Sequence, residues 1–246
     1  MPVIGKLNGR SPWLARRQIR NERPDWRQMS REILASLRTV LIFSLVGLAI
    51  ALSERLGWLA IYEDPLERGL PYLLFNLTVL IVLHDAWFYW THKIMHCPGL
   101  FRWFHRLHHR SHNPSPWTSY AFDASEAAVN AIYLPLALLL MPTSLLAAFL
   151  FVAHMMLRNA VGHCGYEVFP ARRDGRPLIG WLTTVTHHDL HHARPRWNLG
   201  LYFTGWDRLM SPEDPSYHAA LARAVGKSAQ GNLPGSPALA ESVSKG

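Results

Sequence analysis

The chain has 246 residues, of which 49% are hydrophobic and only 17% charged, and its apolar residues come in long runs, so the composition favours a membrane protein over a soluble one. Its net charge of +8 and pI near 9.9 suggest nucleic-acid binding, but the apolar runs argue against that class. The chain has only two cysteines, Cys97 and Cys164, which do not make a disulfide scaffold. They form no CxxC pair, so a thiolate zinc site is also without support.

Residues 1–32 are predicted to form a basic N-terminal arm. We interpret the arm as an amphipathic segment on anionic lipid headgroups, with Trp13 and Trp26 as interfacial anchors. A solvated basic tail is the simpler alternative. The arm carries eight cationic residues, namely Lys6, Arg10, Arg16, Arg17, Arg20, Arg23, Arg27 and Arg31.

Two apolar runs, residues 33–52 and 71–90, are predicted to be the first two membrane spans. Twenty residues at about 1.5 Å per residue reach roughly 30 Å, which is the thickness of a hydrocarbon core. The second run contains the polar pair His84 and Asp85 and ends in an aromatic cluster at 87–90, which is typical of a membrane–water boundary.

Two further apolar runs, residues 127–141 and 143–157, are separated by Pro142. Each reaches only about 22 Å, so they form either two short spans or a hairpin that enters part of the bilayer. The positive-inside rule places the basic arm in the cytoplasm. Either arrangement then brings the N-terminus, every histidine cluster and the C-terminus to the cytoplasmic side.

These elements predict an all-α integral membrane protein whose histidine clusters lie on the cytoplasmic side. The membrane-embedded domain is expected to cover residues 33–210. Residues 211–246 are predicted to be a flexible C-terminal tail, because residues 219–246 are rich in Ala, Gly, Ser and Pro and contain no aromatic residue.

Histidines recur in three clusters with the spacing of a helix face. The clusters lie in the stretches TTVTHHDLHH at 183–192, HRLHH at 105–109 and HKIMH at 92–96. Neutral imidazole is the commonest metal ligand in proteins, and one tetrahedral metal needs at most four ligands. The number of clustered histidines therefore predicts two metal ions held between several helices.

With these motifs in view, the chain resembles the fatty acid hydroxylase/sterol desaturase superfamily of integral-membrane di-metal oxygenases. The resemblance covers about residues 35–210. It rests on HDAWFYWTHKIMH at 84–96, HRLHHRSHNPSPW at 105–117, NAVGHCGYE at 159–167 and TTVTHHDLHH at 183–192, followed by Asn198-Leu199-Gly200 and Trp206-Asp207-Arg208-Leu209.

The resemblance implies an integral membrane helical bundle of about four membrane helices, with a cytoplasmic helical cap whose histidine boxes bind two irons. The first box here ends in His96-Cys97, where many relatives have a second adjacent histidine, but its i, i+4 pair is retained. The ligands implied are His92, His96, His105, His108, His109, His163, His187, His188, His191 and His192. Four further residues are candidate ligands or hydrogen-bond partners of ligands, namely His84, Asp85, His112 and Asp189.

The activity implied by the resemblance is O2-dependent hydroxylation of a C–H bond in a membrane lipid, with desaturation as the alternative. The substrate class stays open between sterols, acyl chains, carotenoids and aminolipid head groups. The chain has no recognisable haem, flavin or iron–sulfur motif, so electrons are expected from a ferredoxin or cytochrome with an NAD(P)H-linked reductase. A zinc hydrolase is disfavoured because there is no HExxH motif. A non-catalytic metal-binding or transport protein is disfavoured because the boxes lie outside the spans.

Overall fold

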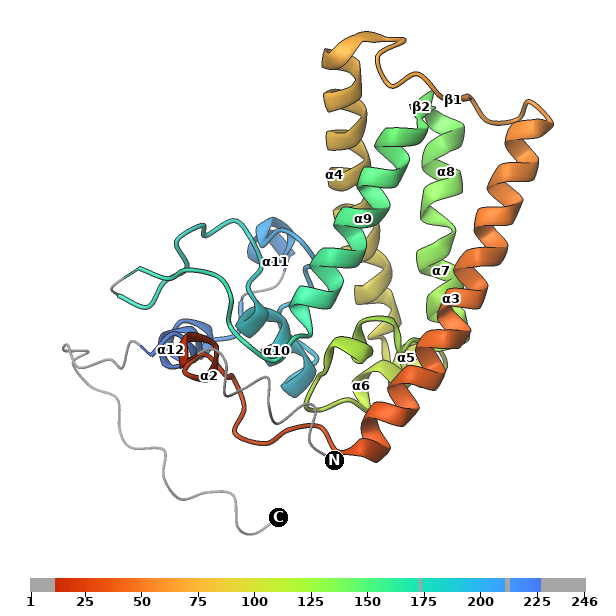
Figure 1. The fold of residues 1–246 in the computed structure, drawn as a ribbon. Coiled ribbons are helices and arrows are strands. Elements are labelled where there is room, and N and C mark those ends of the chain that lie inside the picture. Colours follow the sequence, from red (N-terminus) through yellow and green to blue (C-terminus); the bar gives the residue numbers. More distant parts are fainter. Residues whose placement is uncertain (1–11, 173, 211–212, 227–246) are drawn as a thin grey trace.

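The computed structural model describes residues 12–172, 174–210 and 213–226. Helices dominate these ranges, which confirms the predicted mostly helical class, and the only named strands in them are two pairs of residues. The long helices α3 (Trp26–Arg55), α4 (Gly69–Met95) and α9 (Leu145–Gly162) run side by side with the stacked helices α7 (Ala124–Ala131) and α8 (Tyr133–Leu140), as Figure 1 shows.

Three of these helices, α3, α4 and α9, are long and apolar enough to cross a membrane, and α7 with α8 makes a shorter apolar helix. The spans predicted at 33–52 and 71–90 lie inside α3 and α4. The runs at 127–141 and 143–157 become the two arms of a helical hairpin that turns near Pro142 (Figure 1). The outward faces carry many exposed leucines, as expected for helices whose apolar side chains face lipid.

Local signals set where the helices begin. Asp25 caps α3 by accepting a hydrogen bond from the backbone of Gln28 at 2.6 Å, and Ser144 caps α9 by accepting one from Ala147 at 3.1 Å. Between α4, α8 and α9 lies a small core of Leu80, Tyr133, Ala137 and Phe151. This apolar contact holds the hairpin against α4.

At the end of the bundle far from the histidines, the two connecting loops are joined. Strand β1 (Ile61–Tyr62) pairs in parallel with β2 (Thr143–Ser144). The buried side chain of Asn76 in α4 donates a hydrogen bond to Thr143 Oγ1 at 3.1 Å. These bonds satisfy backbone and side-chain groups that are buried where the helices end.

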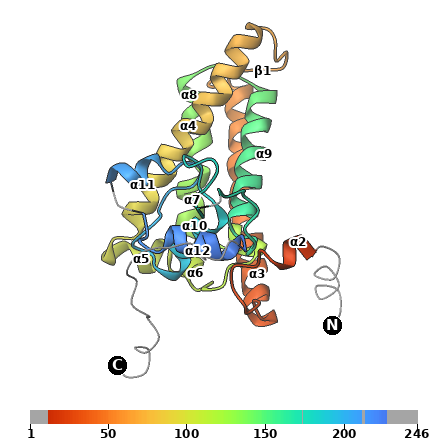
Figure 2. The same ribbon diagram turned by 90° about the vertical axis from the view of Figure 1, so that its left-hand side faces the viewer.

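The short elements gather at the opposite end and form a cap (Figures 1 and 2). They are α2 (Pro12–Ala15), α5 (Pro98–Phe104), α6 (Arg106–His109), the 3-10 helix η1 (Pro116–Tyr120), α10 (Val185–Ala193), α11 (Gly205–Met210) and α12 (Tyr217–Ala224). The second and third histidine boxes therefore lie where the long helices end.

Two helices overlap the segments predicted as the N-terminal arm and the C-terminal tail. Helix α3 begins at Trp26, inside the arm predicted at 1–32, and residues 17–20 pack on the cap. Helix α12 lies inside the tail predicted at 211–246, and its Tyr217 and Leu221 are buried. Those apolar side chains cover α10, which the alanine-rich composition concealed. Residues 1–11 and 227–246 lie outside the described ranges.

Candidate metal centre

Nine histidines meet in two neighbouring groups in the cap. Within each group, the nitrogen atoms that could bind a metal all lie within 4.8 Å of one another. The first group, site A, consists of His92, His96, His105, His109 and His191. The second group, site B, consists of His108, His163, His188 and His192. His96 is half-buried and the other eight are buried, so the geometry provides two enclosed nitrogen-lined sites.

Each of the second and third boxes supplies both sites. In the second box the i, i+4 pair His105 and His109 belongs to site A, and His108 belongs to site B. The third box reverses this, with His188 and His192 in site B and His191 in site A. Residues i and i+4 are about 40° apart around a helix, whereas i+3 is about 100° from i+4. The helical spacing therefore directs His108 of the second box to site B and His191 of the third box to site A, whereas the other two rings of each box point to the opposite site. The three rings of a box do not all point in one direction.

The ring nitrogens of site A converge. Nε2 of His92 lies 2.8 Å from Nε2 of His105 and 3.1 Å from Nε2 of His96. Nε2 of His191 lies 3.0 Å from Nε2 of His109. In site B, Nε2 of His163 lies 2.9 Å from Nε2 of His188 and 3.3 Å from Nε2 of His108.

Backbone carbonyls determine which nitrogen of three rings carries the proton. Nδ1 lies 2.8–2.9 Å from a carbonyl oxygen in His92 with Leu199, His191 with Trp197, and His163 with Asn159. Because a carbonyl can only accept, Nδ1 is the donor and Nε2 presents a lone pair to the site. Lone pairs that face one another at about 3 Å repel, and a cation between them removes that repulsion.

Burial keeps these rings neutral and available. It lowers the pKa of His163 to about 4, although the hydrogen bond to Asn159 acts in the opposite direction. Burial, together with neighbouring histidines, also holds the pKa values of His188 and His192 well below the ordinary range. Both ring nitrogens of His192 are buried without a hydrogen-bond partner. Unpartnered neutral donors of this kind fit a metal ion.

Each of the two groups found in the described part of the chain is made of imidazoles alone. Imidazole binds Zn, Cu, Fe and Ni, so the donor atoms by themselves do not select the metal. Groups of five and four histidines together offer more nitrogen donors than one tetrahedral ion can bind.

Glu126 of α7 is a candidate positioning residue that the sequence reasoning missed. Its Oε1 lies 2.7 Å from Nδ1 of His105, and both side chains are 1% exposed. A carboxylate on the far nitrogen of a ligand imidazole fixes the ring orientation and raises its basicity. The signal was present in the sequence, since an acidic residue at the start of an otherwise apolar helix suggests a function by default.

We expect Glu126→Ala to weaken metal binding at site A by about 10–100-fold, because the His105 ring loses its orienting partner. Metal retained per chain against a graded chelator measures this effect. Glu67→Ala removes an exposed carboxylate at the far end of the bundle and should leave the metal retained at each chelator concentration unchanged. Equal retention by the two variants would contradict the role of Glu126.

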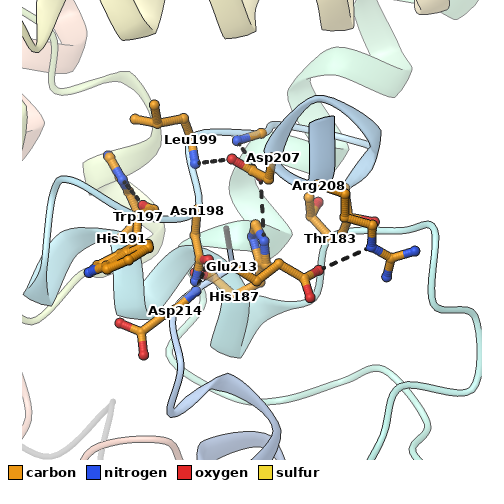
Figure 3. Close-up of polar contacts among 12 residues, drawn as sticks. Thr183, His187, His191, Trp197, Asn198, Leu199, Asp207, Arg208, Glu213 and Asp214 are labelled. Atoms are coloured by element: carbon orange, nitrogen blue, oxygen red, sulfur yellow. Dashed lines mark hydrogen bonds and ion pairs between the residues drawn. The ribbon is translucent and has the colours of Figure 1, made fainter. Parts of the chain in front are cut away.

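A loop after the third box contacts two histidines of site A, and Figure 3 shows this loop beside His191. The carbonyls of Trp197 and Leu199 are the acceptors for His191 and His92. Asp207 of α11 fastens this loop by accepting the backbone N–H groups of Leu199 at 2.8 Å and Gly200 at 2.9 Å. A Cβ on Gly200 would lie 2.6 Å from the carbonyl oxygen of Phe203, so only glycine allows this approach.

His187 was predicted as a ligand, but it lies outside both groups. Its Nε2 is 3.5 Å from Asp207 Oδ2, and its backbone carbonyl accepts a hydrogen bond from Asn198 at 2.9 Å (Figure 3). Burial lowers the pKa of His187 to about 3, so the ring is neutral. The ring lies on the face of α10 that packs against Asp207 and Tyr217, so it points away from the two groups.

The four residues predicted as ligands or as hydrogen-bond partners of ligands also lie outside the two groups, namely His84, Asp85, His112 and Asp189. Asp85 accepts the backbone N–H of Tyr202 at 2.8 Å, and His84 Nδ1 lies 3.0 Å from the hydroxyl of Tyr202, so both support that loop. His112 is exposed. Asp189 is paired with Arg20 of the N-terminal segment at 2.8 Å.

The chain is similar in sequence to several curated enzymes. The chain is 28% identical over 201 residues to a Delta(7)-sterol 5(6)-desaturase of Gibberella zeae, covering 79% of this chain and 60% of that protein. It is 26% identical to the lathosterol oxidase of Rattus norvegicus, covering 74% and 60%. It is 28% identical to the cholesterol 25-hydroxylase of the same organism, covering 57% and 47%.

The chain spans about three fifths or less of the length of the curated relatives it matches. No solved structure matches it significantly. The family model described as fatty acid hydroxylase matches residues 77–211, a range that is more than half of the chain and contains all nine grouped histidines. The chain therefore belongs to the fatty acid hydroxylase family, as its histidine boxes predicted.

Proposed function

We propose that the protein is a membrane-bound di-iron oxidoreductase that uses O2 and two electrons to hydroxylate a C–H bond of a lipid. The observation that carries the proposal is the pair of imidazole groups with converging Nε2 atoms at the end of an apolar bundle. Iron is favoured over other metals by the family and by the names of the relatives, an oxidase and a hydroxylase. Two irons bound there would supply the activation of O2 that an unactivated C–H bond requires.

The residues of the chain provide the surroundings for this chemistry. His92, His96, His105, His109 and His191 would hold one ion, and His108, His163, His188 and His192 the other. Burial of these rings excludes water, and the carbonyls and Glu126 keep them oriented. A pocket beside site B, lined by Gly162, Phe169 and Leu201 as well as His163 and His188, offers a way in for a small reactant.

Hydroxylation consumes one O2, two electrons and two protons, and yields an alcohol and water. Desaturation consumes the same reactants and yields a double bond and two waters. The names of the desaturase and oxidase relatives favour desaturation as the second candidate. A lipid entering from the bilayer suits a site where the long helices end, and a sterol-like substrate is one class that the relatives suggest.

Electrons are proposed to come from a separate ferredoxin or cytochrome with its reductase. The segment from residue 86 to 122 carries Lys93, Arg102, Arg106 and Arg110 and no acidic residue, so an acidic donor would be attracted to it. We propose four crossings, formed by α3, α4, α7 with α8, and α9, with the N-terminus, the cap and the C-terminus in the cytoplasm.

The proposal is tested by counting iron and zinc in the detergent-purified protein and by feeding it lipid extracts. We expect about two irons per chain, with product that depends on O2 and a reductant and that gains one oxygen by mass spectrometry. Loss of two hydrogens would identify a desaturase instead. If the protein, after iron reconstitution, still binds fewer than two metals per chain, the di-iron proposal is wrong.

A further inference from the structure

The chain between α2 and α3 crosses the outside of the cap. Residues 17–19 pair with residues 165–167 through an antiparallel bridge between Gln18 and Tyr166. Flanking backbone hydrogen bonds run from Ile19 N to Gly165 O at 3.0 Å and from Glu167 N to Arg17 O at 2.9 Å. We call residues 17–22 the strap. It is thereby fastened just after the ligand His163.

The strap next contacts the third box. Arg20 Nε donates to Asp189 Oδ1 at 2.8 Å, and Arg20 Nη2 donates to the backbone carbonyl of Asp189 at 3.1 Å. The Asp189 side chain is only 9% exposed and that of Arg20 is 28% exposed. A charge pair this enclosed is costly to break, because one partner is left buried and unpaired. Asp189 follows the ligand His188 directly in α10.

The strap also reaches the chain after the second box. The side chain of Asn113 donates a hydrogen bond to the backbone carbonyl of Glu22 at 2.8 Å. The backbone carbonyl of Asn113 accepts a hydrogen bond from the side chain of Gln28, in α3, at 2.8 Å. Asn113 lies five residues after the ligand His108. The second box, the end of α9 and α10 are thus all tied to one short segment from outside.

These three places are the three chain segments that supply site B. His108 comes from the second box, His163 from the end of α9, and His188 with His192 from α10. Site A differs, because its first-box ligands are carried by α4 and the adjoining His96. In the described ranges, no hydrogen bond of the strap reaches α4.

We propose that the strap holds site B in its metal-binding geometry and that Arg20 is the positioning residue on which α10 depends. The inference rests on the proposed two-metal centre. Helix α10 has nine residues, and its ligands must stay within about 0.5 Å of a productive geometry to bind metal tightly. Without Arg20, the Asp189 carboxylate turns towards solvent and carries His188 with it.

The test counts metal per chain for Arg20→Ala in two backgrounds. In a protein that carries both His96→Ala and His109→Ala, only three rings of site A remain and site B is the complete site. Adding Arg20→Ala to that protein should weaken metal binding by about 10–100-fold in a chelator titration. In a His188→Ala protein, whose remaining complete site is site A, the same change should weaken metal binding much less, because only His191 of the five rings of site A lies on α10. Metal content is read without any turnover assay.

Arg23→Ala removes an exposed arginine of the same segment and serves as the matched control, and Arg20→Lys should restore part of the affinity. Equal metal loss in both backgrounds would mean that Arg20 only stabilises the fold, and no loss in either would mean that the strap is passive. Both results overturn the inference. A wild-type protein that binds fewer than two metals would instead refute the proposed function.

Discussion

Replacing His188 with alanine is expected to reduce turnover by at least about a thousandfold and to lower bound metal from two ions to about one. His188 contributes to site B a buried ring whose Nε2 lies 2.9 Å from that of His163. Site B has only four ligands, so the loss of one leaves an incomplete shell. Metal-ion catalysis contributes several kcal/mol, and each 1.36 kcal/mol is a factor of ten in rate.

The measurement combines metal analysis with product formation from the lipid identified for the wild-type protein. His112→Ala is the matched control, because His112 lies close to the second box but is exposed and outside both groups. It should keep both metals and full turnover. His108→Ala should behave like His188→Ala, since it removes another ligand of the same site. A fully active His108→Ala protein would contradict the ligand assignment.

Asp207→Ala is expected to produce the second large effect, although Asp207 binds no metal in our assignment. Its carboxylate is fully buried and accepts two backbone N–H groups, those of Leu199 and Gly200. Each buried donor left unpartnered costs about 1–3 kcal/mol. The same loop carries the carbonyls that orient His92 and His191. We therefore expect a lower unfolding temperature and about 10–100-fold weaker metal binding at site A.

The two consequences of Asp207→Ala are measured separately, by thermal unfolding of the metal-free protein and by chelator titration. Asp207→Asn retains one acceptor oxygen and should fall between the wild type and the alanine variant. Asp174→Ala provides the control, because its side chain is 58% exposed in a surface turn. Unchanged metal affinity in the His188→Ala background, where site A alone remains complete, would disprove the link from Asp207 to His92.

Local patterns carried much of the prediction. The apolar runs at 33–52 and 71–90 lie within α3 and α4, since a length of about 20 apolar residues is recognisable without tertiary information. The i, i+4 spacing of the first box and the i, i+3, i+4 spacing of the other two identified their histidines. Nine of the ten proposed ligands meet in the structure, and the family was confirmed. These features depend on neighbours within one or two helical turns.

Long-range contacts account for what the sequence concealed. Glu126 lies 21 residues from His105 along the chain, and Arg20 pairs with Asp189 across 169 residues. Only the packing of α7 on the second box brings Glu126 to His105, and only the packing of the strap on α10 brings Arg20 to Asp189. The exclusion of His187 has the same origin, because Asp207 and Tyr217 approach α10 from the side opposite the metal groups.

The amino-acid sequence by itself determined the apolar helices, the histidine spacing and hence a chain with more imidazoles than one metal can bind. Spacing alone does not assign a ring to an ion, because i+3 and i+4 neighbours are both plausible partners on one helix. The tertiary structure decided the division of each box between sites A and B, since that division depends on where α4 and the end of α9 bring their own histidines. It also decided which carbonyls and carboxylates orient the rings, because hydrogen bonds form only between groups that folding brings within about 3 Å.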